Sequence, residues 1–467
     1  MTRRSTSTTH IGGLTIGSDS PILIQSMANT DTNDIATSVA QAKRIFDAGA
    51  QMVRFTTQGT REALSLGEIR RQLQADGYTL PLVADVHFNP KVADVAATLV
   101  EKVRVNPGNY VDPARKFLHL EYTDEQYAEE LERLRSRFSE LLTICRKNGT
   151  ALRIGVNHGS LSDRIMSRYG DTPAGMAESC MEFLRVCKQE QFSDIVLSVK
   201  ASNTRVMYDT VHLLVEAMDK EDMHYPLHLG VTEAGEGEDG RLKSAVGIGG
   251  LLNEGIGDTV RVSLSEAPEA EVPVAQEIVS WCSKSEREKP ATLNIVNDKR
   301  LAESWGKSVP LLIYHSDEQC SWEQFMLHAA ADCGAALWKA DGKDLRIENP
   351  HFTEAQLTTL AKDILQAARV RIYKTEYISC PSCGRTLFDI EKTIAEVKAA
   401  TKHLTGLKIA IMGCIVNGPG EMADADYGYV GAGRGRVSLY KGKECVLKNI
   451  PQEEAVEQLL RLIEADH

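Results

Sequence analysis

Short apolar runs alternate with helix-like stretches along the first part of the chain. Eight runs have the length and composition of buried strands: Ile22–Gln25, Met52–Phe55, Leu82–Val86, Val103–Val105, Leu152–Val156, Ile195–Val199, Leu227–Val231 and Thr259–Val262. Most of the gaps hold apolar residues at helical spacing: Asp34–Asp47, Arg61–Asp76, Pro90–Val100, Pro173–Gln189, Thr204–Asp219 and Lys243–Glu254. This alternation predicts an α/β fold, a (β/α)8 TIM barrel over residues 1–285. A doubly wound open sheet is the alternative, but no Gly-rich dinucleotide fingerprint supports it.

Two further elements elaborate the predicted barrel. Glycines punctuate short apolar runs within His10–Ser20, which predicts a hairpin that closes the bottom of the barrel. The spacer between the fourth and fifth runs is too long for a simple connection and predicts an insertion at about residues 110–147. Thr123–Lys147 has the start signal and the apolar spacing of an amphipathic helix.

After the barrel the alternation stops, and residues 286–372 are expected to form a small separate domain. Its recognisable elements are one strand and two helices: Val309–Tyr314, Trp322–Cys333 and Thr353–Ala368. The potential metal ligands in this region show no ligand spacing: Cys320, Cys333, His315 and His328. The sequence therefore predicts a structural or spacer role for this region.

Residues 373–467 are predicted to form a last α/β domain. A helix, a strand, a Gly-rich β segment and a closing helix are expected at Ile390–Thr401, Leu407–Met412, Tyr427–Tyr440 and Gln452–Ala465.

The last domain carries three thiols at spacings that suit one metal centre. Cys380 and Cys383 are three positions apart, and Cys414 follows an apolar strand 31 positions later (414 − 383). Three thiolates plus one exchangeable ligand suit a [4Fe-4S] cluster, with the Glu421 carboxylate as the fourth ligand. The alternative is a closed zinc site that adds Cys445. The spacing alone leaves both open.

Composition and charge exclude several classes of function. The net charge of −12 makes a general nucleic-acid surface unexpected. The sequence has no apolar run of about 18 residues, and Met1–His10 is short and polar, so neither a membrane span nor a secretory signal is expected. Ten cysteines in 467 residues are too few for a disulfide scaffold. A bacterial cytoplasm, which protects an oxidisable centre, is the expected compartment.

Cations stand at the ends of five of the eight predicted strands. They are Arg54, Arg104, Arg153, Lys200 and Arg261, with Asn157 and Ser263 close by in the sequence. A single arginine is most often an ion-pair partner, but five cations on one rim would repel one another unless an anion binds between them. Each charge-assisted hydrogen bond to that anion is worth roughly 1.5–3 kcal/mol. A diphosphate is the expected ligand of these cations.

Two carboxylates also fall at the predicted strand ends, Asp85 and Glu233. Each either orients an arginine or transfers protons. Glu233 is the preferred proton donor or acceptor because it lies between small residues beside a Gly-rich loop. A phosphate pocket beside a centre with one open iron predicts the reductive removal of a hydroxyl, or opening of a C–O bond, in a small phosphorylated molecule.

Several stretches together resemble the 4-hydroxy-3-methylbut-2-enyl diphosphate synthase family of isoprenoid biosynthesis. They include Ile24–Met27, Ala84–Phe88, Val103–Asn109, Arg153–Ser160, Ser198–Ser202, Gly230–Gly235, Asp258–Ser263, Cys380–Arg385 and Met412–Glu421. They cover both the barrel and the last domain, in order. Other stretches, around Asp124 and Gly235–Arg241, look like the long form of the family.

The resemblance implies a reaction of the methylerythritol phosphate pathway. Two electrons open the ring of 2-C-methyl-D-erythritol 2,4-cyclodiphosphate and remove a hydroxyl as water, giving 4-hydroxy-3-methylbut-2-enyl diphosphate. The electrons would come from reduced ferredoxin or flavodoxin.

The resemblance also assigns the site residues. One [4Fe-4S] cluster per chain would be held by Cys380, Cys383, Cys414 and Glu421. The diphosphate would be bound by Arg54, Arg104, Arg153, Asn157, Lys200, Arg261 and Ser263, and Asn417 would face the substrate. Glu233, with Asp85 close by, would transfer protons.

One departure from the family concerns the middle of the chain. The long form carries a much larger insert than Pro290–Arg371. In the short form two chains pair head to tail, each cluster domain capping the other chain's barrel, so a homodimer is one possibility here. The resemblance leaves open whether the cluster domain caps its own barrel, and predicts domain closure about a hinge near Lys374 or Glu376.

Two other functions are compatible with the residues alone. One is a transferase built on a pterin- or phosphate-binding barrel with a structural zinc module. The other is a non-catalytic metal scaffold that senses a phosphorylated metabolite. Metal analysis distinguishes the zinc-containing transferase from a cluster enzyme. Turnover with a reductant distinguishes the cluster enzyme from the non-catalytic scaffold.

Overall fold

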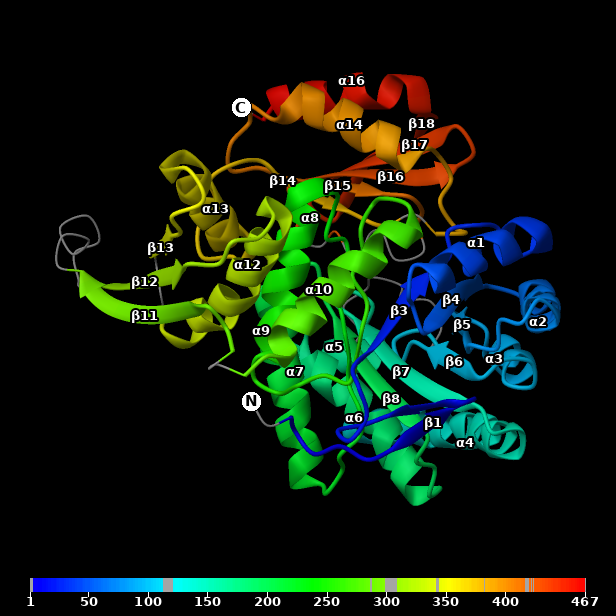
Figure 1. The fold of residues 1–467 in the computed structure, drawn as a ribbon. Coiled ribbons are helices and arrows are strands. Elements are labelled where there is room, and N and C mark those ends of the chain that lie inside the picture. The colour runs from blue at the N-terminus through cyan, green and yellow to red at the C-terminus, as the bar shows by residue number, and fades with distance from the viewer. Residues whose placement is uncertain are drawn as a thin grey trace.

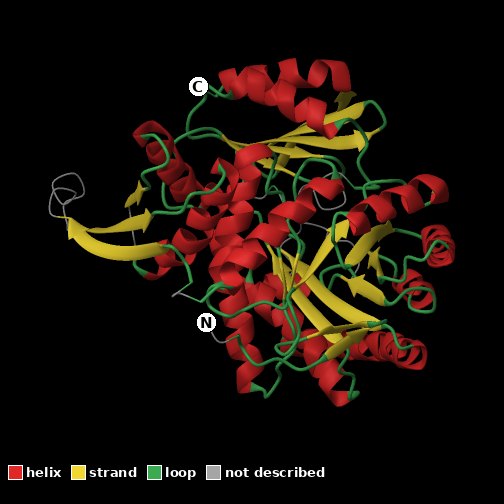
Figure 2. Cartoon of the chain, viewed as in Figure 1, coloured by secondary structure: helices red, strands yellow, loops and turns green. Residues whose placement is uncertain are grey.

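The computed structural model describes most of the chain: residues 3–111, 121–285, 288–298, 309–341, 344–381, 383–415, 420, 422 and 424–466. A parallel barrel, a three-stranded sheet with two helices, and a five-stranded sheet with two helices follow one another along the chain (Figures 1 and 2). Among the described residues, no helix has the length and apolar character needed to cross a membrane.

The predicted barrel is confirmed, strand for strand. Its strands are β3 (Leu23–Met27), β4 (Met52–Thr57), β5 (Leu82–Val86), β6 (Lys102–Val105), β7 (Ala151–Asn157), β8 (Ile195–Lys200), β9 (His228–Leu229) and β10 (Thr259–Val260). They pair in parallel in the order β8-β7-β6-β5-β4-β3-β10-β9. A bridge between Leu197 and Leu227 joins the two ends of this order and closes the barrel.

The N-terminal hairpin closes the bottom of the barrel, as predicted. Strands β1 (Thr9–Ile11) and β2 (Leu14–Ile16) pair antiparallel. Ile11 and Ile16 form a buried cluster with residues near the starts of the barrel strands, such as Met52 and Val196. This apolar plug leaves the opposite end, where the strands finish, for chemistry.

Helices surround the barrel (Figure 1): α1 (Ile35–Asp47), α2 (Thr60–Ala75), α3 (Pro90–Ala96), α4 (Asp124–Asn148), α5 (Asp163–Tyr169), α6 (Pro173–Gln189), α7 (Thr204–Lys220), α8 (Gly237–Ser244), α9 (Gly250–Leu252) and α10 (Glu271–Ser283). The helix α4 in the predicted insertion begins with a capping box between Thr123 and Gln126. The helix expected at Lys243–Glu254 instead continues from α8 through a π-helical turn, Ala245–Gly249, into α9.

The region after the barrel has more strands than its sequence suggested. Besides β12 (Val309–Ser316), it contains β11 (Ala291–Asp298) and β13 (Asp344–Glu348), which pair on either side of β12. The sheet is accompanied by α12 (Trp322–Lys339) and α13 (Glu354–Ala367). β11 was missed because its exposed apolar positions, such as Ile295, are ordered by antiparallel pairing with β12 and not by burial.

Helix α12 packs directly against the barrel's own helical layer. A Cβ added at Gly249 would lie 2.4 Å from the Cβ of Ala331, and one added at Gly334 would lie 2.8 Å from the backbone oxygen of Val246. Only glycine permits helices to approach this closely. The region after the barrel is therefore fixed to the barrel by tight backbone packing.

The last five-stranded sheet contains β14 (Glu376–Ser379), β15 (Lys408–Met412), β16 (Tyr427–Gly433), β17 (Arg436–Lys441) and β18 (Glu444–Pro451) in that order. Helices α14 (Ile390–Thr401) and α16 (Gln452–Glu464) pack on it. In Figure 1 this unit lies above the mouth of the barrel. The domain boundaries proposed from the sequence, at 285 and 372, stay a prediction.

Candidate active site at the mouth of the barrel

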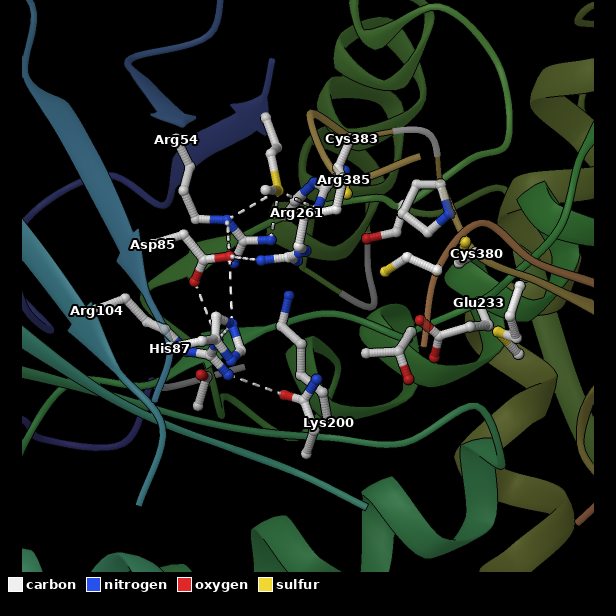
Figure 3. A pocket seen from close by; sticks show the side chains of 18 of the residues that line it. Arg54, Asp85, His87, Arg104, Lys200, Glu233, Arg261, Cys380, Cys383 and Arg385 are labelled. Atoms are coloured by element: carbon white, nitrogen blue, oxygen red, sulfur yellow. Dashed lines mark hydrogen bonds and ion pairs between the residues drawn. The ribbon is translucent and has the colours of Figure 1, made fainter. Parts of the chain in front are cut away.

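One pocket brings the predicted cations and the predicted thiols together (Figure 3). Its described lining from the barrel is Met27, Arg54, Asp85, His87, Arg104, Arg153, Asn157, Ser198, Lys200, Thr232, Glu233, Arg261 and Ser263. Its lining from the last domain is Cys380, Pro381, Cys383, Arg385, Met412 and Cys414. Asn417 and Glu421 lie outside the described residues. The pocket therefore contains every other residue that the sequence assigned to the site.

Three of the arginines lie deeper than predicted. Arg54, Arg104 and Arg153 are each the third residue of their strands and not the last. Arg104 is in register with Asp85 on one side and with Arg153 on the other. The cations thus extend from inside the barrel to its mouth, which makes the pocket deep and not a surface rim.

Arg104 is held by a dense set of partners. Its guanidinium donates to Asp85 Oδ1 at 2.9 Å, to the Gly155 carbonyl at 2.8 Å and to Asn157 Oδ1 at 3.2 Å, and contacts His87 Nε2 at 2.6 Å. Burial lowers the pKa of His87 to about 4, so this ring is neutral at pH 7. Arg104 is therefore locked in one orientation before any ligand arrives.

Arg54 and Arg261 converge on Met27. Arg54 Nη2 lies 2.8 Å and Arg261 Nη1 3.5 Å from the Met27 sulfur. Arg261 is also paired with Glu271 at 2.9 Å. Burial lowers the pKa of Arg54 to about 10, even though Asp85, 4.0 Å away, opposes the shift. A thioether compensates a guanidinium poorly, so Arg54 retains capacity to bind an anion, whereas Arg261 is already paired through two hydrogen bonds with Glu271.

Arg153 and Lys200 are the least compensated cations in the pocket. Arg153 is 1% exposed, and its Nε and Nη1 find no hydrogen-bond partner among the described residues. Burial, and then the neighbouring Arg54 and Arg104, hold the pKa of Arg153 well below its ordinary value. Burial and Arg153 do the same for Lys200. An arginine stays charged in a protein, so this arrangement stores repulsion that a bound anion would relieve.

Two glycines make room for these cations inside the barrel. A Cβ on Gly155 would lie 2.7 Å from Arg104 Nε, and a Cβ on Gly230 would lie 2.6 Å from Lys200 Nζ. Any larger residue at these two positions would push a cation out of place. The glycines at these two positions are therefore required by the space that the side chains of Arg104 and Lys200 occupy inside the barrel.

Glu233 has an unusual backbone conformation. Its φ of 50° lies in the left-handed region, which residues other than glycine rarely adopt, and it is 3% exposed. The next residue, Ala234, forms a parallel bridge with Ser379, directly before Cys380. Strained backbone at a pocket is a common feature of functional sites. The bridge places Glu233 between the barrel and the thiols.

Asp85 is ionised in this setting. Burial alone would raise its pKa, but Arg54, Arg104 and His87 outweigh that effect and hold the pKa well below its ordinary value. A carboxylate so strongly stabilised is a poor proton donor. Asp85 is thus better suited to orienting Arg104 than to protonating a leaving group.

The three thiols enter the pocket from two neighbouring loops. Cys380 and Cys383 follow β14, and Cys414 follows β15, so parallel pairing brings the loops together. Cys380 Sγ accepts a hydrogen bond from the Gly413 amide at 3.2 Å. Burial and the adjacent Cys383 hold the pKa of Cys380 well above its ordinary value. A positive metal centre would be needed to keep this sulfur as a thiolate.

The geometry of the thiols does not suit a single zinc ion. Among the described residues, these three sulfurs do not form a set that lies within 4.8 Å of one another. One zinc ion with bonds of about 2.3 Å would hold its sulfurs roughly 3.8 Å apart. Cys445 is exposed on β18, at the opposite edge of the sheet from β14. Cys445 is therefore not placed beside the other three thiols as a fourth ligand, and the kind of metal centre that these thiols hold stays a prediction.

The last domain is fastened to the barrel of the same chain. Ser265 Oγ lies within 3.0–3.3 Å of Ser379 and the Cys380 carbonyl. The buried Glu376 carboxylate pairs with Lys243 at 3.1 Å and with Arg369. Residue 376, a predicted hinge candidate, is thus held in a network when the pocket is covered.

Two titratable residues in the described pocket lining were not assigned from the sequence. Arg385 reaches from the cysteine loop to 3.8 Å from Asp85, although 300 positions separate them (385 − 85). His87 contacts Arg104, as described above. Arg385 ends the Cys380–Arg385 motif, so its position beside two of the predicted metal-binding cysteines was the available signal. It adds a sixth cation to the lining, against the two carboxylates Asp85 and Glu233.

Comparisons with known proteins agree with both halves of this site. Residues 6–276 match the family model of the GcpE TIM-barrel domain, and residues 376–465 match that of the GcpE protein C-terminal domain. A 4-hydroxy-3-methylbut-2-en-1-yl diphosphate synthase (flavodoxin) of Parabacteroides distasonis is 48% identical, over 99% of this chain and 98% of its own length. Proteins of the same name from Phocaeicola vulgatus and Porphyromonas gingivalis are 47% and 44% identical, over 99% of this chain and 98% and 97% of theirs.

The relatives contain segments that this chain lacks. The alignment with the Parabacteroides protein spans 596 positions, whereas this chain has 467 residues. This difference agrees with the expectation of a chain that is shortened relative to the long form.

Proposed function

This chain belongs to the GcpE family, and we propose that it is a 4-hydroxy-3-methylbut-2-enyl diphosphate synthase that opens and dehydroxylates 2-C-methyl-D-erythritol 2,4-cyclodiphosphate. The observation that carries the proposal is the single pocket in which undercompensated cations face three converging thiols. Neither half alone requires this reaction. A pocket that joins a diphosphate site to a metal centre supports a reductive reaction on a phosphorylated substrate.

The cations bind the diphosphate of the substrate. Arg153 and Lys200 have the least compensation of the barrel cations, Arg54 has a thioether as its nearest partner, and Arg261 is paired with Glu271. Binding replaces cation–cation repulsion with charge-assisted hydrogen bonds. Asn157 and Ser263 add neutral polar groups to the same wall, and Asn417 is proposed to face the substrate from the cysteine loop.

Glu233 handles the proton that leaves with the hydroxyl as water. Its carboxylate is buried, lies at the junction of barrel and cysteine loops, and sits on a strained backbone that fixes its direction. Asp85 assists by holding Arg104, since its pKa is too low for proton donation. This division of roles refines the sequence prediction, in which either carboxylate could transfer protons.

Cys380, Cys383 and Cys414, with Glu421 as fourth ligand, would hold one [4Fe-4S] cluster per chain. Such a cluster supplies electrons one at a time and an open iron for a substrate oxygen. The spread of the thiols and the burial of Cys380 support this assignment. The names of the relatives, which include flavodoxin, support flavodoxin as the electron donor, in preference to ferredoxin.

The pocket is completed within one chain. The cysteine loops that cover the barrel come from the same chain. The backbones of Gly159, in the barrel, and Gly420, in the last domain, also lie against each other. This cover excludes water and strengthens every electrostatic interaction with the substrate. A homodimer is consequently not required to assemble the site.

An anaerobic preparation tests the proposal directly. We expect about four irons and four sulfides per chain, in line with [4Fe-4S] chemistry. The same protein, given the cyclodiphosphate and reduced flavodoxin, should form the alkenyl diphosphate. A colourless protein that binds one zinc at these cysteines would refute the cluster, and a four-iron protein without turnover would refute the substrate assignment.

A further inference from the structure

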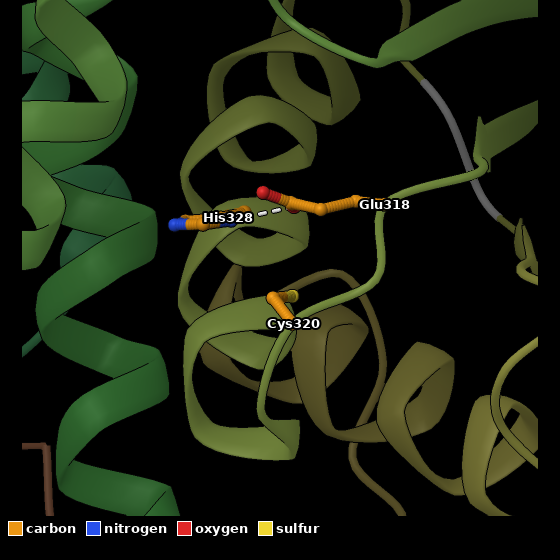
Figure 4. A group of neighbouring side chains, drawn as sticks. All are labelled: Glu318, Cys320 and His328. Carbon is orange, nitrogen blue, oxygen red and sulfur yellow. Dashed lines mark hydrogen bonds and ion pairs between the residues drawn. The ribbon is translucent and has the colours of Figure 1, made fainter.

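A second group of metal-binding side chains lies outside the pocket, in the region after the barrel. Glu318, Cys320 and His328 each present a ligand atom, and these atoms all lie within 4.8 Å of one another (Figure 4). Glu318 and Cys320 lie in the loop between β12 and α12, and His328 lies on α12. The sequence showed no ligand spacing here, because these three side chains come together only in the tertiary structure.

Glu318 is in contact with both of the other members. Its Oε2 lies 2.8 Å from His328 Nδ1, and burial together with the neighbouring Glu318 carboxylate raises the pKa of Cys320 to about 12. His328 is 2% exposed, whereas Glu318 and Cys320 are partly exposed. The two loop residues are therefore accessible to solvent, whereas the histidine is enclosed.

The other face of His328 has the arrangement that is usual for a metal-binding imidazole. Its Nε2 lies 2.7 Å from Glu277 Oε1, on the barrel helix α10. A metal-bound histidine almost always donates its second ring N–H to a carboxylate, which fixes the tautomer. The Trp281 ring stacks on His328 at 3.9 Å and 7°, which fixes the plane of the imidazole.

We propose that Glu318, Cys320 and His328 Nδ1 bind one divalent cation of the zinc class, with Glu277 as the outer partner of the histidine and water as the fourth ligand. Imidazole, thiolate and carboxylate are all ligands of zinc, at about 2.0–2.3 Å. Such bonds place ligand atoms roughly 3.3–3.8 Å apart. The present spacing requires Glu318 to move back from His328 by less than a bond length.

The bound ion would join the region after the barrel to the barrel itself. Glu318 is positioned by its own backbone, whose amide bonds Ser316 Oγ and whose carbonyl accepts from Asn349. His328 links the same ion to α10 through Glu277. The ion would thus tie a loop, α12 and a barrel helix at one point, far in sequence from the cysteine motif.

Zinc binding to the cluster-loaded chain tests this proposal. The holoenzyme is incubated with Zn²⁺, desalted, analysed for metal, titrated with a competing chelator, and examined by X-ray absorption at the zinc edge. We expect one zinc per chain whose shell contains one sulfur at about 2.3 Å and lighter ligands otherwise. Glu277→Gln should weaken binding roughly 10–100-fold while the ligands remain.

Matched variants identify the ligands. Cys320→Ser should lose the sulfur signal and the tight site, whereas Cys445→Ser, which alters an exposed thiol on β18, should retain both. Zinc with three sulfurs, unaffected by Cys320→Ser, would mean binding at the other cysteines and would overturn the proposal. An unchanged zinc affinity in Glu277→Gln would also overturn the proposal. If Glu277 only forms an ion pair with His328 and does not support a metal-bound imidazole, its replacement should not alter zinc binding.

Discussion

Replacing Arg153 with methionine should separate ligand binding from folding. Arg153 is buried without a hydrogen-bond partner for Nε or Nη1 among the described residues, so its charge destabilises the chain without ligand. Replacing even a paired buried charge by a well-packed apolar side chain of similar volume is often neutral or stabilising, by up to about 4 kcal/mol, so removal of an uncompensated charge should not destabilise the chain. The melting temperature of Arg153→Met without substrate should therefore stay level or rise.

The same change should greatly weaken substrate binding. A guanidinium that forms two charge-assisted bonds to a diphosphate contributes roughly 3–6 kcal/mol, at about 1.5–3 kcal/mol each. This loss corresponds to roughly a 10²–10⁴-fold weaker Kd, since about 1.4 kcal/mol is tenfold. The measurement is the melting temperature across a substrate titration, together with KM for the cyclodiphosphate.

Arg164→Met is the matched control, because Arg164 is equally buried but paired with Glu182 at 2.6 Å. Breaking a buried ion pair costs about 3–5 kcal/mol, so this variant should melt several degrees lower. Its KM, measured below that melting point, should change little because Arg164 does not line the pocket. If Arg153→Met melts as low as Arg164→Met and keeps its KM, then Arg153 is a structural ion-pair partner and the anion argument fails.

Three further outcomes follow from the structure. Glu233→Gln should keep substrate affinity but lower kcat by about 10²–10⁴-fold, and near-normal turnover would assign the proton elsewhere. Cys414→Ser should lose iron, while Cys445→Ser keeps it; equal iron contents would remove Cys414 as a ligand. Burial raises the pKa of Glu254, but hydrogen bonds led by that from His212 lower it to about 2. The ionised carboxylate of Glu254 stabilises the fold above about pH 4.5, and this stabilisation is lost as the pH falls toward 2. In Glu254→Gln the melting temperature should therefore depend less on pH over that window.

Much of the fold could be predicted because its signals are local. Apolar runs of strand length marked all eight barrel strands, and the capping residues around Thr123 marked the start of α4. The strands β9 and β10 are shorter in the structure than the apolar runs Leu227–Val231 and Thr259–Val262 that predicted them. β13 and β14 were missed because four or five residues carry little periodicity and are ordered by pairing with a neighbouring strand.

The pocket also has some features that the sequence predicts and others that only the tertiary structure determines. The sequence by itself determined the residue types, because cations near the ends of several predicted strands and three cysteines at metal-ligand spacing are visible in the order of the chain. Only the tertiary structure decided how deep the arginines lie, and that Arg385 reaches Asp85. It also decided that the cysteine loops cover the barrel of their own chain.

The group formed by Glu318, Cys320 and His328 shows the physical reason for this division. Sequence patterns report on neighbours along a strand or around a helical turn. A ligand set depends on which side chains meet after helices and sheets pack, and Glu277 reaches His328 only because α10 packs beside α12. The chain alone fixed the barrel and its charges, whereas packing determined which of its reactive groups meet.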